Sequence, residues 1–110
     1  MATRLTYSDT FSEEFDEYVH SAYLDFGNKA AKNWVSSYQT IVKRLKVMPE
    51  SYPYVMIGKR VFRQYRGANF MHNFKLVYRY DANNDVARLI KILDMRRNPN
   101  ALVHEIKLIK

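Results

Sequence analysis

Two stretches in the first half of the chain carry apolar residues at every third or fourth position, which is the spacing of one helix face. A capping-box pattern at Thr10–Glu13 predicts the start of the first helix, and Gly27 is suited to end it. Asn28 is expected to cap the second helix, which Pro49 stops. Helices joined by so short a link fold back on each other, so an antiparallel hairpin is predicted. The two apolar stripes consist of Phe11, Phe15, Tyr18, Val19, Ala22 and Phe26, and of Ala31, Trp34, Val35, Tyr38, Ile41, Val42, Leu45 and Met48.

Strand-like patterns lie on both sides of this hairpin. Arg4–Ser8 alternates apolar and polar residues and predicts a short opening strand. Lys59–Arg66 and Phe74–Tyr80 show the same period of two after the hairpin. Val86–Met95 is apolar on both faces, as expected of a strand inside a sheet, and the turn-forming residues 81–85 precede it.

These elements follow one another in the order β-α-α-β-β-β. That order predicts an α+β fold in which the helical hairpin packs on one face of a small, mainly antiparallel sheet. The segment 99–110 is left open: Asn98 and Pro99 suit the start of a helix, whereas Glu105–Lys110 is compatible with a further strand. A length of 110 residues fits one domain, so residues 1–110 are expected to form a single unit.

Composition narrows the classes of protein and of site. The chain has no cysteine, which excludes disulfide frameworks, thiol nucleophiles and cysteine-based zinc sites. Its three histidines lack the spacing of a metal site, so we expect neither a metal nor another cofactor. The N-terminus shows no signal-peptide pattern and no apolar run is long enough to span a bilayer. We therefore expect a cytoplasmic protein without a membrane partner.

Charge is distributed unevenly along the chain, whose net charge is +7. Residues 1–28 hold one basic and six acidic residues, for a net charge of −5. Residues 29–110 hold 17 basic and five acidic residues, for a net charge of +12. Such polarity favours a partner that is a phosphate backbone or an acidic protein segment, although a solvated basic face without a special partner explains it too.

Three segments, in this order and in a chain of this length, resemble the RelE/ParE superfamily of toxins from type II toxin–antitoxin pairs. They are the end of the hairpin at Leu45–Pro49, the strand Phe74–Tyr80, and the segment Ile90–Pro99. The resemblance spans nearly the whole chain. It implies growth inhibition, neutralisation by a cognate antitoxin that wraps the toxin, and hence a toxin–antitoxin hetero-oligomer.

The superfamily includes two different activities. RelE-like members cut messenger RNA inside the ribosome, whereas ParE-like members block DNA gyrase and have no established hydrolytic site. The long hairpin, from Ser8 to Met48, and the arginine-rich ending Arg96–Pro99 favour the ParE-like branch. Ribosome-acting relatives with long hairpins exist, so a ribosome-dependent mRNA endoribonuclease is the alternative. A non-toxic nucleic-acid-binding domain is a second alternative.

A ribonuclease of this kind needs a base, an acid for the leaving oxygen, and cations around the phosphorane. The resemblance implies Lys75 as the mid-strand cation and Arg96 or Arg97 as the cation after the last strand. His104 is the nearest acid–base candidate, because Leu102 stands about where the family has a tyrosine. The family's Lys-x-Lys pair is not reproduced. The catalytic set is thus partial, and an enzyme is not the preferred interpretation.

Four further arginines are candidates for binding a nucleic acid or a protein target: Arg60, Arg63, Arg66 and Arg79. They lie on the two predicted strands that follow the hairpin. A solvated basic surface is the alternative explanation for them, and His104 suits an ordinary surface position.

Overall fold

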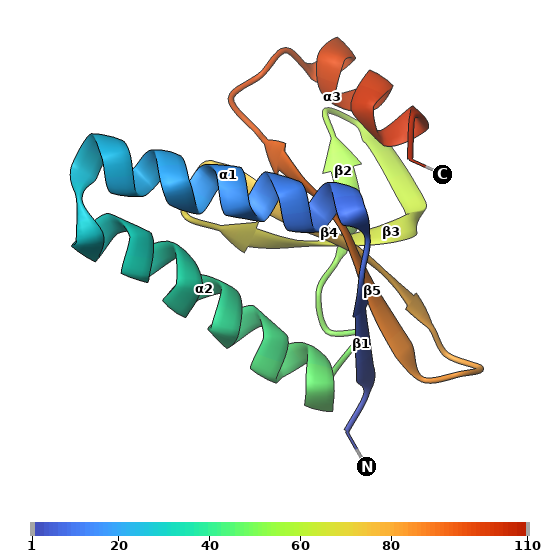
Figure 1. Ribbon diagram of the computed structural model, residues 1–110. Helices are drawn as coiled ribbons and strands as arrows, with labels where there is room; N and C mark the ends of the chain where they lie inside the picture. The colour runs from blue at the N-terminus through green and yellow to red at the C-terminus, as the bar shows by residue number, and fades with distance from the viewer. Residues whose placement is uncertain (1, 110) are drawn as a thin grey trace.

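The computed structural model describes residues 2–109 and has three layers, with a sheet between a helical hairpin and one short helix (Figure 1). The predicted α+β class and the hairpin are confirmed. No helix within residues 2–109 is both long and apolar enough to cross a bilayer. The elements are β1 (Arg4–Tyr7), α1 (Asp9–Phe26), α2 (Asn28–Val47), β2 (Tyr54–Ile57), β3 (Arg60–Phe70), β4 (Phe74–Asp81), β5 (Val86–Asp94) and α3 (Pro99–Lys107).

The predicted cap of the first helix is wrong by two residues. Ser8, not Thr10, caps α1, because its Oγ accepts a hydrogen bond from the Phe11 N–H at 3.0 Å. Ser8 is held extended by the sheet: its N–H donates to the Leu89 carbonyl and its Oγ donates to the Ile90 carbonyl. The helix therefore begins directly after β1.

The link between the two helices also differs from the prediction. Gly27 ends α1 at a φ of 90°, a left-handed conformation that glycine adopts readily, and its N–H bonds to the Tyr23 carbonyl. The same glycine is the N-cap of α2. Asn28 is already the first helical residue and its side chain makes no capping bond, so the prediction that Asn28 caps α2 is wrong.

The sheet has five strands in the order β1-β5-β4-β3-β2. β1 runs parallel to β5, and the other pairs are antiparallel, which confirms a mainly antiparallel sheet. Two predictions need correction. The edge strand β2 was not predicted, and β3 continues to Phe70 instead of ending at Arg66.

Each face of the sheet carries its own core. α1 and α2 pack on one face and α3 packs on the other, so the prediction of helices on one face holds for the hairpin alone. Neighbouring residues of β4 divide accordingly: Leu76 belongs to the first core and Val77 to the second. The hairpin core consists of Phe11, Ala22, Trp34, Ile41, Leu45, Ala68, Phe70, Phe74, Leu76, Tyr78, Ala87, Leu89 and Ile92. The α3 core consists of Val55, Ile57, Tyr65, Val77, Ile90, Leu93, Leu102 and Ile106.

The segment that the sequence left open is a helix. The Asn98 side chain accepts a hydrogen bond from the Asn100 N–H at 2.8 Å, and Pro99 takes the first helical position, where a missing N–H costs nothing. Leu102 and Ile106 lie one turn apart and are both buried against the sheet. Local capping and burial of this stripe together determine the helix.

Candidate functional site

Lys75 lies in the middle of β4 on the face that carries α3, because it alternates with Leu76 of the hairpin core. Its aliphatic stem crosses Gly67 of β3, where a β-carbon would stand 2.5 Å from the Lys75 Cδ. Glycine is therefore what lets the stem lie flat on the sheet. Burial lowers the pKa of the Lys75 ammonium. No carboxylate among residues 2–109 forms an ion pair with it.

Arg96 follows β5 and is held by Asp94. Its Nε and Nη2 each donate to a different Asp94 oxygen at 2.9 Å, which is the paired geometry that suits a guanidinium and a carboxylate. The guanidinium carbon also stands 5.4 Å from the centre of the Phe74 ring. Hydrogen bonds from Arg96 hold the pKa of Asp94 below its usual range.

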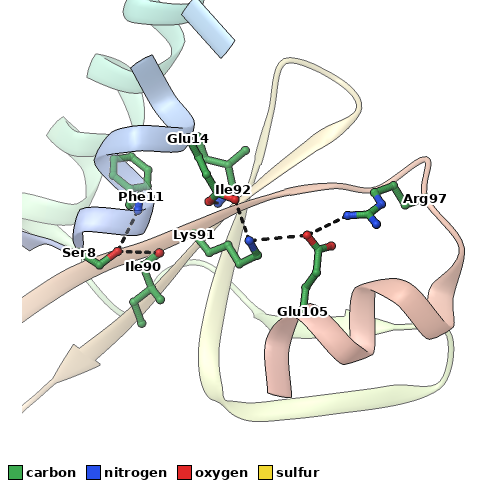
Figure 2. A network of polar contacts seen from close by, with 8 residues as sticks. All are labelled: Ser8, Phe11, Glu14, Ile90, Lys91, Ile92, Arg97 and Glu105. Carbon is green, nitrogen blue, oxygen red and sulfur yellow. Dashed lines mark hydrogen bonds and ion pairs between the residues drawn. The ribbon is translucent and has the colours of Figure 1, made fainter. Parts of the chain in front are cut away.

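Arg97 belongs to a network that joins three elements (Figure 2). Its Nη1 lies 2.9 Å from Glu105 of α3, which in turn lies 3.6 Å from the Lys91 ammonium of β5. Lys91 also contacts Glu14 of α1 at 2.7 Å, and Glu14 accepts the Ile92 N–H at 3.0 Å. Arg97 thus helps to fix α3 to the sheet.

Sequence reasoning missed Glu14, Lys91 and Glu105 as members of this network. One signal was visible: Lys91 is a single charge in the segment 89–93, whose other four residues are all leucine or isoleucine. A charge in that setting needs a carboxylate partner. The sequence does not indicate which carboxylates pair with Lys91, because both come from elements distant in the sequence. The second oxygen of Glu105 is buried without a hydrogen-bond partner among residues 2–109.

The four candidate catalytic residues lie in four different surroundings. Lys75 is half-buried on the sheet, whereas the guanidinium groups of Arg96 and Arg97 each contact a carboxylate. His104 is exposed on α3, one residue before Glu105. Burial moves the pKa of the Lys75 ammonium toward neutrality, which makes its amine a candidate for proton transfer.

The four candidate binding arginines also separate. Arg66 is fixed by its own fold: its Nη1 donates to the carbonyls of Glu50 and Tyr52, at 3.1 and 2.8 Å. Arg60 and Arg63 are exposed in the first half of the same strand, β3. Arg79 is exposed on β4, opposite Arg88 of β5. The four arginines therefore do not form one group. Only Arg60 and Arg63 are exposed on the same strand, whereas Arg66 has a structural role and Arg79 lies on another strand.

Comparison with known proteins identifies the fold. No protein-family model matches the chain, and no curated protein matches it. A solved structure of the chromosomal ParDE TA system from P. aeruginosa matches with a TM-score of 0.63 and 13% identity, covering 82% of this chain and 92% of that one. A mutant of the E. coli toxin RelE in the free state matches with a TM-score of 0.58 and 12% identity, covering 98% of this chain and all of that one. The chain has the RelE/ParE fold.

A second structure of isolated E. coli RelE gives a TM-score of 0.57 at 13% identity, covering 96% of this chain and 97% of that one. The RelE/ParE fold thus extends over almost the whole molecule. Within this fold, the site residues differ in their partners: Lys75 has no ion-pair partner within residues 2–109, whereas Arg96 and Arg97 are each paired with a carboxylate.

Proposed function

We propose that this chain is the toxin of a type II toxin–antitoxin pair and that it inhibits growth by binding its target, with DNA gyrase favoured, rather than by cleaving RNA. The RelE/ParE fold and the basic segment 29–110 support a toxin with an acidic antitoxin partner. The observation that carries the preference for binding is the pairing of Arg96 with Asp94 and of Arg97 with Glu105. Cations already neutralised in this way contribute little to stabilising a phosphorane.

The second candidate is a ribosome-dependent mRNA endoribonuclease, and one observation favours it. Burial lowers the pKa of Lys75, which makes proton transfer by its amine easier near neutral pH. In this candidate Lys75 acts on the RNA, and Arg96 or Arg97 must leave its carboxylate to reach the phosphate, with His104 as a further acid–base group.

Two gel assays on the purified chain separate these functions. The proposed function predicts that micromolar protein inhibits DNA supercoiling by gyrase and leaves mRNA intact in a translating extract. A chain that cuts mRNA and leaves supercoiling unchanged would instead establish the ribonuclease. In that case the double variant Lys75→Ala, Arg97→Ala should lose cleavage, whereas Arg88→Ala, at an exposed arginine on the neighbouring strand β5, should retain it.

Expression in a bacterial host tests the toxin itself. Induction of the chain alone should arrest growth, and co-expression of a cognate antitoxin should restore it by forming a hetero-oligomer. Gyrase and ribosomes are both in the cytoplasm, so the proposed function also implies that location. Normal growth with abundant, folded protein would contradict a toxin and favour the non-toxic nucleic-acid-binding domain.

A further inference from the structure

A groove lies between the first half of β3 and the C-terminal end of α3, two elements that Figure 1 shows next to each other on the side away from the hairpin. It encloses about 380 Å³. Its charged lining residues are Arg60, Arg63 and Lys107, and its apolar ones include Phe62, Ile106 and Ile109. No acidic residue lines it. None of the three cations forms an ion pair with any of residues 2–109.

The two arginines are pre-positioned by aromatic rings. The guanidinium carbon of Arg60 stands 4.9 Å from the centre of the Phe62 ring, and that of Arg63 stands 5.9 Å from the centre of the Tyr54 ring. Such cation–π contacts restrain these long side chains without using their N–H groups. A carboxylate or phosphate can be bound there in a paired geometry without ordering the arginine first.

The backbone of β3 widens at the same place. Tyr54 is opposite Arg66 while the next residue of β2, Val55, is opposite Phe62. Residues 63–65 consequently have no opposite residue on β2, and pairing with β4 begins only at Arg66. Such a bulge redirects side chains and ends regular pairing at the edge of a sheet. It places Arg63 at the groove instead of within the strand pairs.

We propose that this groove binds an extended segment of a partner protein in which carboxylates alternate with large aliphatic side chains. The three cations complement the carboxylates, and Phe62 of β3 together with Ile109, just after α3, offers an apolar surface to the aliphatic side chains between them. A nucleic acid fits less well, because bases bind by stacking on aromatic faces and the Arg60 guanidinium already lies over the Phe62 ring. The inference rests on the proposed function, because the partner is the antitoxin that neutralises the toxin. It adds the surface that this partner binds and the type of segment that it uses.

Fluorescence anisotropy with a labelled peptide of alternating Glu and Val tests the groove directly. About twelve residues suffice, since at about 3.3 Å per residue they span the molecule. The double variant Arg60→Glu, Arg63→Glu should weaken binding by about tenfold or more. The matched control Arg4→Glu, Arg88→Glu makes the same charge change at two exposed arginines on β1 and β5 and should weaken it by less than about twofold.

Equal losses in the two double variants would overturn the proposal, because the attraction would then be a property of net charge. A single-stranded RNA of equal length is the competing ligand. If it binds more tightly than the peptide, and if only the double variant Arg60→Glu, Arg63→Glu loses that binding, the groove is a nucleic-acid site and the proposal is overturned. Circular dichroism confirms that both variants are folded before they are compared. The assay does not depend on toxicity: a chain that arrests growth but ignores the peptide contradicts only this inference, and a harmless chain that binds it contradicts only the proposed function.

Discussion

Gly67 and Lys75 show how one missing side chain sets the environment of another. An alanine β-carbon at position 67 would lie 2.5 Å from the Lys75 Cδ and 3.1 Å from a Val55 methyl group. Gly67→Ala should therefore lift the lysine off the sheet, raise its pKa toward the ordinary value, and destabilise the fold by about 1–3 kcal/mol. Carbon-13 NMR titration of the Lys75 Cε measures the pKa. An unchanged titration in the folded variant would contradict this account.

Lys75→Met provides the control for that experiment. Methionine keeps an unbranched stem over Gly67 without the ammonium, so it separates the packing of the stem from the titration of the charge. If the clash with the stem is what destabilises the fold, Gly67→Ala should lower the free energy of unfolding by the same amount whether residue 75 is lysine or methionine.

Tyr78 gives the fold a dependence on alkaline pH. Its ring is fully buried, its hydroxyl donates to the Pro49 carbonyl at 2.7 Å, and burial raises its pKa to about 12. The folded state therefore needs the neutral phenol, whose pKa is about 10 in the unfolded chain. Stability is complete below pH 10 and should fall as the pH rises from 10 toward 12.

Tyr78→Phe should remove part of that alkaline loss and leave the Pro49 carbonyl without its donor, at a cost of about 1–2 kcal/mol at neutral pH. Urea unfolding of the two proteins between about pH 8 and pH 11 measures both effects. Parallel curves for the two proteins across this range would show that another group causes the alkaline loss.

At the scale of elements, the start of α1 depends on Ser8. The serine accepts from the Phe11 N–H and donates to the Ile90 carbonyl, so it both caps the helix and ties it to β5. Ser8→Ala should cost about 1–2 kcal/mol in the free energy of unfolding. Thr10→Ala, at the position that the sequence favoured as the cap, is exposed and should change it by less than about 0.5 kcal/mol. Similar losses from the two substitutions would contradict Ser8 as the cap.

The elements divide into those that the sequence determines locally and those that depend on the rest of the fold. The hairpin was predictable because its two apolar stripes face one core, which includes Trp34. β2 was missed because Tyr54 and Met56, on its outer side, are apolar yet exposed, and so no alternation is visible. The extension of β3 was missed because Gly67 and Ala68 carry no pattern, although Gly67 is needed beneath Lys75.

The candidate site was predictable only in its residue types. Lys75, Arg96 and Arg97 could be named from the resemblance, but the partner of Arg97 comes from another element. Asp94 lies two residues from Arg96, so that pair is local. Glu105 reaches Arg97 only because α3 folds back on the sheet, which the sequence left undecided. Long-range ion pairs of this kind follow from topology, not from spacing.

At the scale of the whole molecule, the sheet is shared by two cores of unequal size. The hairpin core covers one face, and the smaller α3 core covers the other. Adjacent residues of the same strands belong to different cores, as Leu76 and Val77 do on β4. Loosening either core therefore disturbs strands on which the other depends, and we expect the chain to unfold as one cooperative unit.

A pair of leucines tests this cooperativity. Leu45 and Leu102 are almost completely buried, with exposed fractions of 0% and 2%, and they lie in the hairpin core and the α3 core respectively. Replacing either by alanine makes the same chemical change and should lower the free energy of unfolding by about 2–5 kcal/mol. If the two cores are coupled through the sheet, hydrogen exchange in Leu102→Ala should accelerate in β4 and β5 as well as in α3. Faster exchange confined to α3, with an unchanged urea midpoint, would mean that α3 opens independently of the sheet.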